Sequence, residues 1–179
     1  MKTFRELLDE SGTLDEVKKE PQVKVTRKEL DKMIKNNEDL SNLDVSGVTD
    51  MESMFEGSKF NGDISKWDVS NVDNMCEMFK GSGFNGDISK WDVSEVVTMN
   101  MMFEKCIEFN QDISKWNVSK VSDMRKMFKG CNKFNQDISK WNVSKVWQAQ
   151  HMFQKCKIKE ENKPHFIGDP SQDMWDLIS

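Results

Sequence analysis

Apolar and polar residues alternate along this chain in a pattern that repeats every 24 or 25 residues. The segment Asp-Ile-Ser-Lys-Trp begins at Asp63, Asp87, Asp112 and Asp137. The segment Met-x-x-Met-Phe begins at Met51, Met75, Met99 and Met124, and a degenerate fifth copy ends in Met152-Phe153. A regular period over five copies predicts a repeat architecture in which each unit packs on the next.

Each unit contains three patterns. Trp67 and Val69 fall on one face of a short alternating segment, with polar residues on the other face, as in a strand. Apolar residues then follow at helical spacing, from Val72 to Phe79, and Thr49 with Glu52 forms a capping box before the first such turn. Asn61-Gly62-Asp63 has the composition of a turn. The unit is therefore predicted as strand, helical turn and Asn/Asp turn.

These patterns together resemble one known family. Residues Phe60 to Phe79 match the phrase F-N-x-D-I-S-x-W-D-V-S-N-V-x-x-M-x-x-M-F throughout. This phrase is typical of the BspA-type leucine-rich-repeat family, also described as the Mycoplasma surface-lipoprotein repeat. The resemblance implies an α/β fold: a right-handed leucine-rich-repeat-like solenoid of about five short strand and helical-turn rungs, used for protein contacts. We expect helical caps at both ends, because the terminal rungs would otherwise expose their apolar faces.

The chain divides into three predicted regions: residues 1–39 as a leader and capping helix, 40–156 as the repeats, and 157–179 as a C-terminal cap or tail. Thr26 and Glu29 form a capping box that opens a helix to about Asn36. Residues Val23 to Val25 are a candidate extra strand. Asp169-Pro170 can open a last helix, whose apolar residues include Met174 and Trp175. This helix either caps the repeats or binds a partner.

The first ten residues carry a second resemblance. Met1-Lys-Thr-Phe begins them and Leu8-Asp9-Glu10 ends them. They resemble the capsid-targeting leader of T-even-type phage internal head proteins, which is cleaved after such a glutamate. The resemblance implies a phage-encoded protein that is packaged in the virion and acts on host proteins in the host cytoplasm. The alternative is a short amphipathic helix that Thr3 and Glu6 cap.

Composition narrows the function classes. The chain has 179 residues with 26 Lys and Arg against 31 Asp and Glu, a net charge of −5, which argues against a nucleic-acid-binding protein. No apolar run is long enough for a membrane span, and the start of the chain lacks the pattern of a secretory signal. We therefore expect no membrane partner, a cytoplasmic location and reduced thiols at the four cysteines, which are Cys76, Cys106, Cys131 and Cys156.

Several residues could suggest catalysis or metal binding, but the repeat pattern favours a structural role for each of them. Cys156 and His151 could form a hydrolase pair, but cysteine or serine fills the position of Cys156 in every unit, as at a small buried site. Met-x-x-Met could bind copper, although a methionine in every unit beside Phe is more typical of core packing. The Asp63 column could bind calcium but favours turn hydrogen bonds, and the Asn61 column is expected to form an asparagine ladder. We predict a non-enzymatic protein without a metal or cofactor.

The exposed face of the predicted strands is the candidate partner-binding site. It consists of a lysine column (Lys66, Lys90, Lys115 and Lys140) and a neighbouring column (Asp68, Asp92, Asn117 and Asn142). In the last unit, Trp147 and His151 join it, and Trp147 is either a binding hot spot or packs under the C-terminal helix. The predicted function is a protein–protein interaction module that binds and inhibits a host defence protein. The alternative function is a surface adhesin. The alternative interpretation of the lysine and Asp/Asn columns is a solvated face without a binding role.

Overall fold

The computed structural model of the protein describes residues 22–166, and its regular elements lie at the two ends of that range. They are β1 (Val23–Lys24), α1 (Arg27–Lys35), β2 (Leu43–Asp44) and the 3-10 helix η2 (Glu160–Asn162). β1 pairs in parallel with β2, with Val23 opposite Leu43. The leader at residues 1–10 and the helix expected from Asp169 lie outside the described residues.

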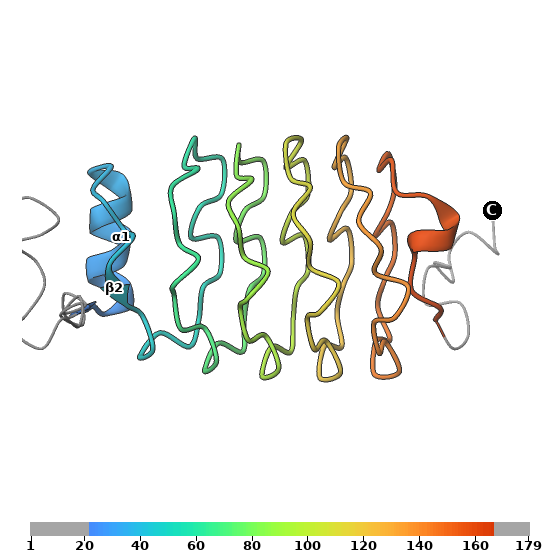
Figure 1. Ribbon diagram of the computed structural model, residues 1–179, viewed down its shortest axis with the longest axis horizontal. Coiled ribbons are helices and arrows are strands. Elements are labelled where there is room, and N and C mark those ends of the chain that lie inside the picture. The colour runs from blue at the N-terminus through green and yellow to red at the C-terminus, as the bar shows by residue number, and fades with distance from the viewer. Residues whose placement is uncertain (1–21, 167–179) are drawn as a thin grey trace, which may run out of the picture.

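The predicted fold class is wrong. Between β2 and η2 the structure contains neither a helix nor a strand, only turns and isolated parallel bridges such as Asp50 with Asn74 and Asp123 with Gln148. No α/β solenoid of strand and helical-turn repeats is seen. Instead, irregular loops of one repeat each lie side by side in a row between α1 and η2 (Figure 1). We call each such loop a rung.

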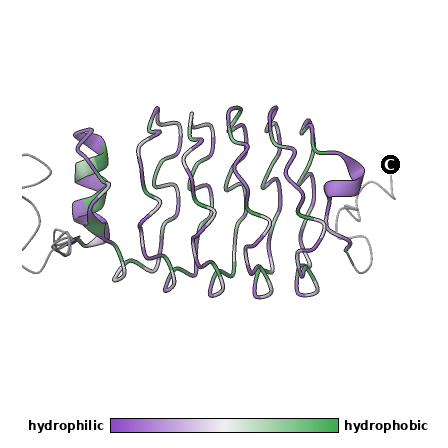
Figure 2. Cartoon of the chain, viewed as in Figure 1, coloured by the Kyte–Doolittle hydropathy of each residue, from purple (hydrophilic) through white to green (hydrophobic). Residues whose placement is uncertain are grey.

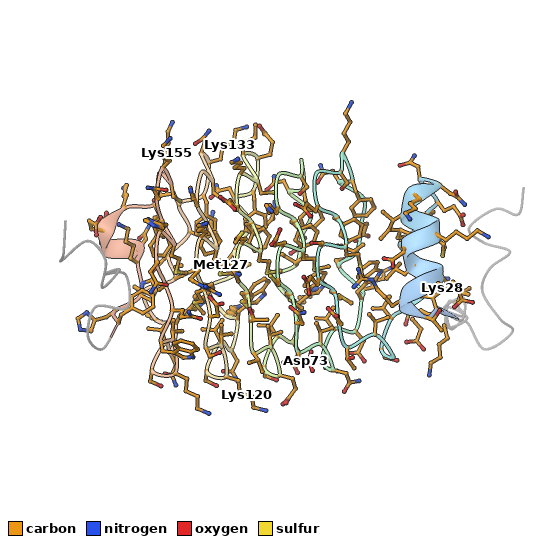
Figure 3. The ribbon with its side chains drawn as sticks, turned by 180° about the vertical axis from the view of Figure 1, so that it is seen from behind. Lys28, Asp73, Lys120, Met127, Lys133 and Lys155 are labelled. Carbon is orange, nitrogen blue, oxygen red and sulfur yellow. The ribbon has the colours of Figure 1, made fainter. Side chains whose placement is uncertain are left out.

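Hydrogen bonds between rungs replace the predicted helical turns. We call this part of each rung the ladder arm; its residues are 49–57, 73–81, 97–105, 122–130 and 147–155. In the first four rungs, from the third residue of the arm onward, every second backbone N–H donates to a carbonyl of the next rung, as in Glu77 N to Asn100 O at 2.9 Å. At the first residue the direction is reversed, as in Asp73 N to Thr49 O at 2.9 Å (Asp73 is labelled in Figure 3). Other N–H groups donate to carbonyls three residues back, as in Lys80 N to Glu77 O at 3.0 Å. These bonds pair most backbone donors of the first four arms without a helix.

Backbone geometry explains why no helix propagates in the ladder arm. One position in every rung adopts a left-handed conformation with φ between 52° and 58°, and its occupants are Ser53, Glu77, Met101, Lys126 and His151. A second such position, four residues later, is occupied by Gly57, Gly81, Lys105, Gly130 and Lys155. A left-handed residue interrupts the right-handed α conformation. The helix-like spacing of apolar residues therefore arises from consecutive turns.

The other side of each rung is also built from turns. We call it the turn arm; its residues are 60–70, 84–94, 109–119 and 134–144. Asp112 Oδ1 accepts the backbone N–H of Ser114 at 2.9 Å, and Trp116 N donates to Ile113 O at 3.1 Å. Trp116 also donates its indole Nε1–H to Ile88 O of the preceding rung at 3.1 Å, and the other three rung tryptophans do the same. The predicted strand is absent here too.

The apolar core fills the space between the two arms. Phe79 and Phe103 from successive ladder arms stack at 5.6 Å, and Phe79 also lies 6.3 Å from Trp91 of the turn arm. The rung tryptophans are 3–5% exposed, which confirms their predicted burial, and the Met51 column is buried as predicted. Apolar and polar residues alternate along every rung (Figure 2). Each arm thus buries one side and exposes the other.

The predicted Thr26 capping box and the asparagine ladder are both confirmed. The Thr49–Glu52 capping box is wrong, since no helix begins there and Glu52 N donates to Asp50 Oδ1 at 2.9 Å. Thr26 caps α1, accepting from Glu29 N while the Glu29 carboxylate accepts from Thr26 N at 2.8 Å. On the turn arms, Asn85 Oδ1 accepts the backbone N–H of Asn110 at 2.9 Å, and the equivalent bond recurs from Asn61 as far as Lys159. These bonds hold each turn arm to the next.

Arg27 of α1 closes the first rung of the ladder. Its Nη1 donates to Asp50 O at 2.7 Å and its Nη2 to Glu52 O at 2.8 Å. The equivalent carbonyls one rung later, Asn74 O and Cys76 O, accept backbone N–H groups of the first rung. The guanidinium therefore supplies the two donors that a preceding rung would have supplied.

Removing a buried tryptophan should destabilise the protein far more than removing its exposed neighbour. We expect Trp116→Ala to lower the free energy of unfolding by about 3–5 kcal/mol, because it leaves a cavity between the arms. Lys115→Ala should change it by less than about 0.5 kcal/mol. Urea unfolding of both variants measures the difference, and equal losses would show that the core is assigned to the wrong side.

Gly81 and Gly83 provide a matched test of the left-handed position. No atom lies within 4 Å of the place that an added Cβ would take at either glycine, but only Gly81 has a left-handed φ, of 64°. Gly81→Ala should therefore cost about 1–2 kcal/mol in unfolding free energy through backbone strain. Gly83→Ala should be neutral or stabilise by about 0.4–1 kcal/mol. Similar effects in thermal or urea unfolding would contradict the left-handed assignment.

Candidate functional site

The predicted lysine and Asp/Asn columns lie on the turn arms and point to solvent, as expected. All eight residues are exposed: Lys66, Asp68, Lys90, Asp92, Lys115, Asn117, Lys140 and Asn142. Within residues 22–166, none of these lysines forms an ion pair within 4.0 Å. The columns therefore form a continuous polar face on one side of the row of rungs.

This turn-arm face is not simply basic. The aspartate three residues before each lysine interacts with it electrostatically, as Asp112 does with Lys115 and Asp137 with Lys140. Those four residues line a shallow hollow of about 400 Å³ between two rungs. Since acidic and basic columns alternate, the aspartate next to each lysine offsets the repulsion expected among the stacked lysines. The face presents a mixed charge pattern.

The Asp63 column forms the predicted turn bonds. The hydroxyl and the backbone N–H of Ser114 lower the pKa of Asp112, and those of Ser139 lower the pKa of Asp137, because both bonds favour the charged carboxylate. Ser119 and Ser144 make the same backbone bond to Asn117 and Asn142 at 3.2 Å. An amide can therefore replace the carboxylate in such a turn.

Trp147 and His151 lie on the ladder arm, on the opposite side of the core from the lysine column. The structure thus does not bring the predicted residues together in one site. Trp147 is 66% exposed, so no element within residues 22–166 covers it, and the helix expected from Asp169 lies outside that range. The same position in earlier rungs holds Thr49, Asp73, Val97 and Ser122, of which Val97 is also an exposed apolar residue.

Four residues that sequence reasoning missed surround this pair. We call the whole group the ladder-face patch; it consists of Arg125, Lys126, Trp147, Gln148, Gln150 and His151. All of them except Trp147 line a hollow of about 310 Å³. The signal that could have found them is a position whose residue type changes from rung to rung. The position of Arg125 holds Glu52, Cys76, Asn100 and Gln150 in the other rungs.

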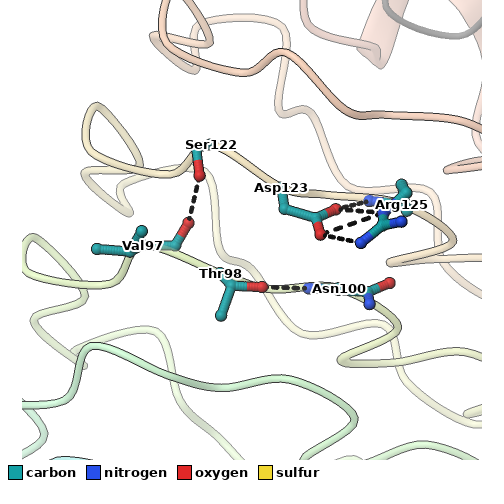
Figure 4. A network of polar contacts seen from close by, with 6 residues as sticks. All are labelled: Val97, Thr98, Asn100, Ser122, Asp123 and Arg125. Atoms are coloured by element: carbon teal, nitrogen blue, oxygen red, sulfur yellow. Dashed lines mark hydrogen bonds and ion pairs between the residues drawn. The ribbon is translucent and has the colours of Figure 1, made fainter.

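Arg125 is held in place by a carboxylate of its own rung. Its Nε donates to Asp123 Oδ1 at 3.0 Å and its Nη2 to Asp123 Oδ2 at 2.6 Å (Figure 4). This bidentate pair raises the pKa of Arg125 and fixes the plane of its guanidinium. Oδ1 of Asn100 and Oε1 of Gln150 occupy the flanking rungs, and these buried acceptors have no hydrogen-bond partner among residues 22–166.

The cysteines do not form a reactive centre. Burial and the nearby Glu77 and Glu52 raise the pKa of Cys76 to about 11. Burial also raises the pKa of Cys156, whose thiol faces the carbonyl of Phe134 at 3.7 Å. Both thiols stay protonated near neutral pH, so neither is an activated nucleophile. The four cysteines are free, and Cys106 and Cys131 are buried as predicted.

Residues 22–166 contain neither a candidate metal cluster nor a candidate membrane span. In that range, no three His, Cys, Asp or Glu residues gather in a way that could hold a metal ion. No helix in the same range combines the length and apolar character needed to cross a bilayer.

Acid should weaken the turn arms, and amide replacement should remove part of that effect. The pKa values of Asp112 and Asp137 are lower in the folded chain than in the unfolded one, so their stabilisation is present above the unfolded pKa, about 3.9. It is lost as the pH falls through the folded pKa. Urea midpoints measured from pH 7 to pH 3 should fall less for Asp112→Asn/Asp137→Asn than for the parent. Parallel curves would contradict this prediction.

Comparison with known proteins gives one match. A family model described as "Mycoplasma protein of unknown function, DUF285" matches residues 25–83 and 81–166. Neither the curated proteins nor the solved structures gave a match. The finding confirms the Mycoplasma-type part of the resemblance seen at Phe60 to Phe79, while the phage leader stays a prediction. Because the matches cover more than half of its residues, the chain belongs to this Mycoplasma protein family.

Proposed function

We propose that the protein is a non-enzymatic protein-binding module and that the ladder-face patch is its main contact surface. The observation that carries the proposal is the 66% exposure of Trp147. A large indole that is kept in water contributes little to folding. Tryptophan and arginine are the residues that most often dominate binding energy at protein interfaces.

The composition of the patch favours an acidic partner. Lys126 and Arg125 carry positive charge on the ladder arm next to that of Trp147, and Asp123 is occupied by its bidentate pair with Arg125. Nη1 of Arg125 makes no hydrogen bond to any of residues 22–166, so it can donate to an incoming carboxylate. We expect a partner that has an apolar hollow for the indole, bordered by carboxylates.

The turn-arm face is the weaker candidate surface because its features serve every rung alike. Asp63, Asp87 and Asp112 each accept a serine N–H in the same turn, and each has a lysine as its electrostatic neighbour. These residues are explained by the folding of the rung itself. The ladder-face patch is different, since Trp147 and Arg125 are the one tryptophan and the one arginine within the five ladder arms.

The finer version of the proposal concerns a phage. If residues 1–10 are a capsid-targeting leader, the protein is delivered into a host cell, where it binds and inhibits a host protein such as a defence protein. Mass spectrometry of the protein from infected cells tests this version separately. A mature N-terminus at Ser11 would support it, and an intact Met1 in virions would contradict it.

Binding should be lost when the patch is changed and kept when the turn-arm face is changed. For a partner isolated with the full chain, we expect Trp147→Ala to weaken the dissociation constant at least about 30-fold, as for a hot-spot residue. Ser122→Ala, at the same position one rung earlier, is the matched control and should have little effect.

The double variant Lys90→Glu/Lys115→Glu tests the other face in the same titration. We expect it to bind like the parent, because both side chains lie on the opposite arm. If the double variant loses binding and Trp147→Ala keeps it, the contact surface is the turn-arm face. If both bind like the parent, neither face mediates the interaction.

A further inference from the structure

From the third residue of each arm onward the ladder has one direction, and it leaves the last rung with donors from Ala149 to Lys155; at the first residue the direction is reversed, so Trp147 O lies at the same edge as an acceptor. Met124, Phe128 and Gly130 donate their backbone N–H groups to carbonyls of the last rung, at 2.8–3.0 Å. In that rung, the N–H groups of Ala149, Phe153 and Lys155 occupy the equivalent alternating positions, and they find no acceptor among residues 22–166. The outward carbonyls are already used, as in Met152 N to Ala149 O. The edge is therefore a row of donors.

The chain covers only one arm of this last rung. Lys159 N donates to Asn135 Oδ1 at 2.9 Å, and Ile138 N donates to Asn162 O at 2.9 Å, so that η2 continues the turn arms. No such continuation exists for the ladder arm within the described range. Beside it lies an open hollow of about 610 Å³, whose lining includes Met152, Phe153 and Phe166. Glu160 and Lys163 also line the hollow, and Lys163 Nζ lies 5.5 Å from the centre of the Phe153 ring. The hollow thus combines apolar and charged walls with the N–H groups of Ala149 and Phe153, for which residues 22–166 offer no acceptor.

The opposite end of the row shows how such an edge is closed. At that end the outward backbone groups are carbonyl acceptors, and the guanidinium of Arg27 donates to two of them. A donor edge needs the reverse, which is a segment with carboxylates or free carbonyls. Its apolar side chains must also reach the hollow beside Phe153.

We propose that residues 167–179 of this chain bind that edge and close the ladder. The described chain ends at Phe166, which itself lines the hollow, so the segment starts at the site. It contains three aspartates (Asp169, Asp173 and Asp176) and no Lys or Arg. Residues 154–166 next to the edge carry four lysines against two glutamates, which gives the complementary charge.

The segment also has the apolar residues that the hollow requires. Met174 and Trp175 lie between Asp173 and Asp176, and Leu177 and Ile178 follow. Carboxylates that accept from the donor row would place these side chains against the last ring of the phenylalanine column, Phe153, which stacks on Phe128 at 5.9 Å. The charged and apolar halves of the site are thus matched within one short segment.

Amide hydrogen exchange of the full chain, followed by NMR, tests the proposal. In the parent, the amides of Ala149, Phe153 and Lys155 should exchange slowly although the described residues offer them no acceptor. The variant Asp173→Asn/Trp175→Ala/Asp176→Asn should accelerate these three amides at least about 10-fold. Amides of Lys126 and Phe128, inside the ladder, should not change and show that the fold is intact.

Ser171→Ala/Gln172→Ala in the same segment is the matched control and should leave all five rates unchanged. The proposal is overturned if the edge amides of the parent exchange as fast as unprotected ones. It is also overturned if they are slow but indifferent to the triple variant. Protection that rises with protein concentration would identify a second copy, and protection only after an acidic partner is added would identify an external segment. Either result would exclude the chain's own segment as the occupant.

Discussion

From the third residue of each ladder arm onward, alternate backbone N–H groups donate to the next rung, and the remaining features of the structure depend on this one-way ladder. It sets the spacing at which the Phe79 and Trp91 columns stack, and it requires a left-handed residue at fixed positions. It also makes the two ends of the row chemically different. Acceptors face α1, where Arg27 meets them, and donors face the other end.

Much of this could be predicted from sequence because burial follows residue type. The repeat period, the buried tryptophans, the asparagine ladder and the Thr26 capping box all came from local patterns and are confirmed. The helical turn and the strand were wrong, since apolar residues at positions i, i+3 and i+4 satisfy a helix and a chain of turns equally well. Only the left-handed φ of residues such as Met101 and Lys126 distinguishes the chain of turns from a helix, and neither residue type indicates a left-handed conformation.

The candidate site was predictable only in part. Exposure of the lysine column followed from the register of each repeat, whereas the sequence left open whether Trp147 is exposed or packed under a helix. That the two lie on opposite sides of the core did not, because the predicted strand and helical turn fixed no relative orientation. Arg125 was missed because its column holds Glu, Cys, Asn, Arg and Gln in turn, and such a column has no pattern to recognise.

Scalar couplings across hydrogen bonds, measured by NMR, test the direction of the ladder most directly. They report which carbonyl carbon accepts each amide. The one-way ladder predicts a coupling from Glu77 N to the carbonyl of Asn100, and from Met101 N to the carbonyl of Arg125. Couplings from these same amides to carbonyls four residues back would instead show α-helical turns and would contradict the ladder.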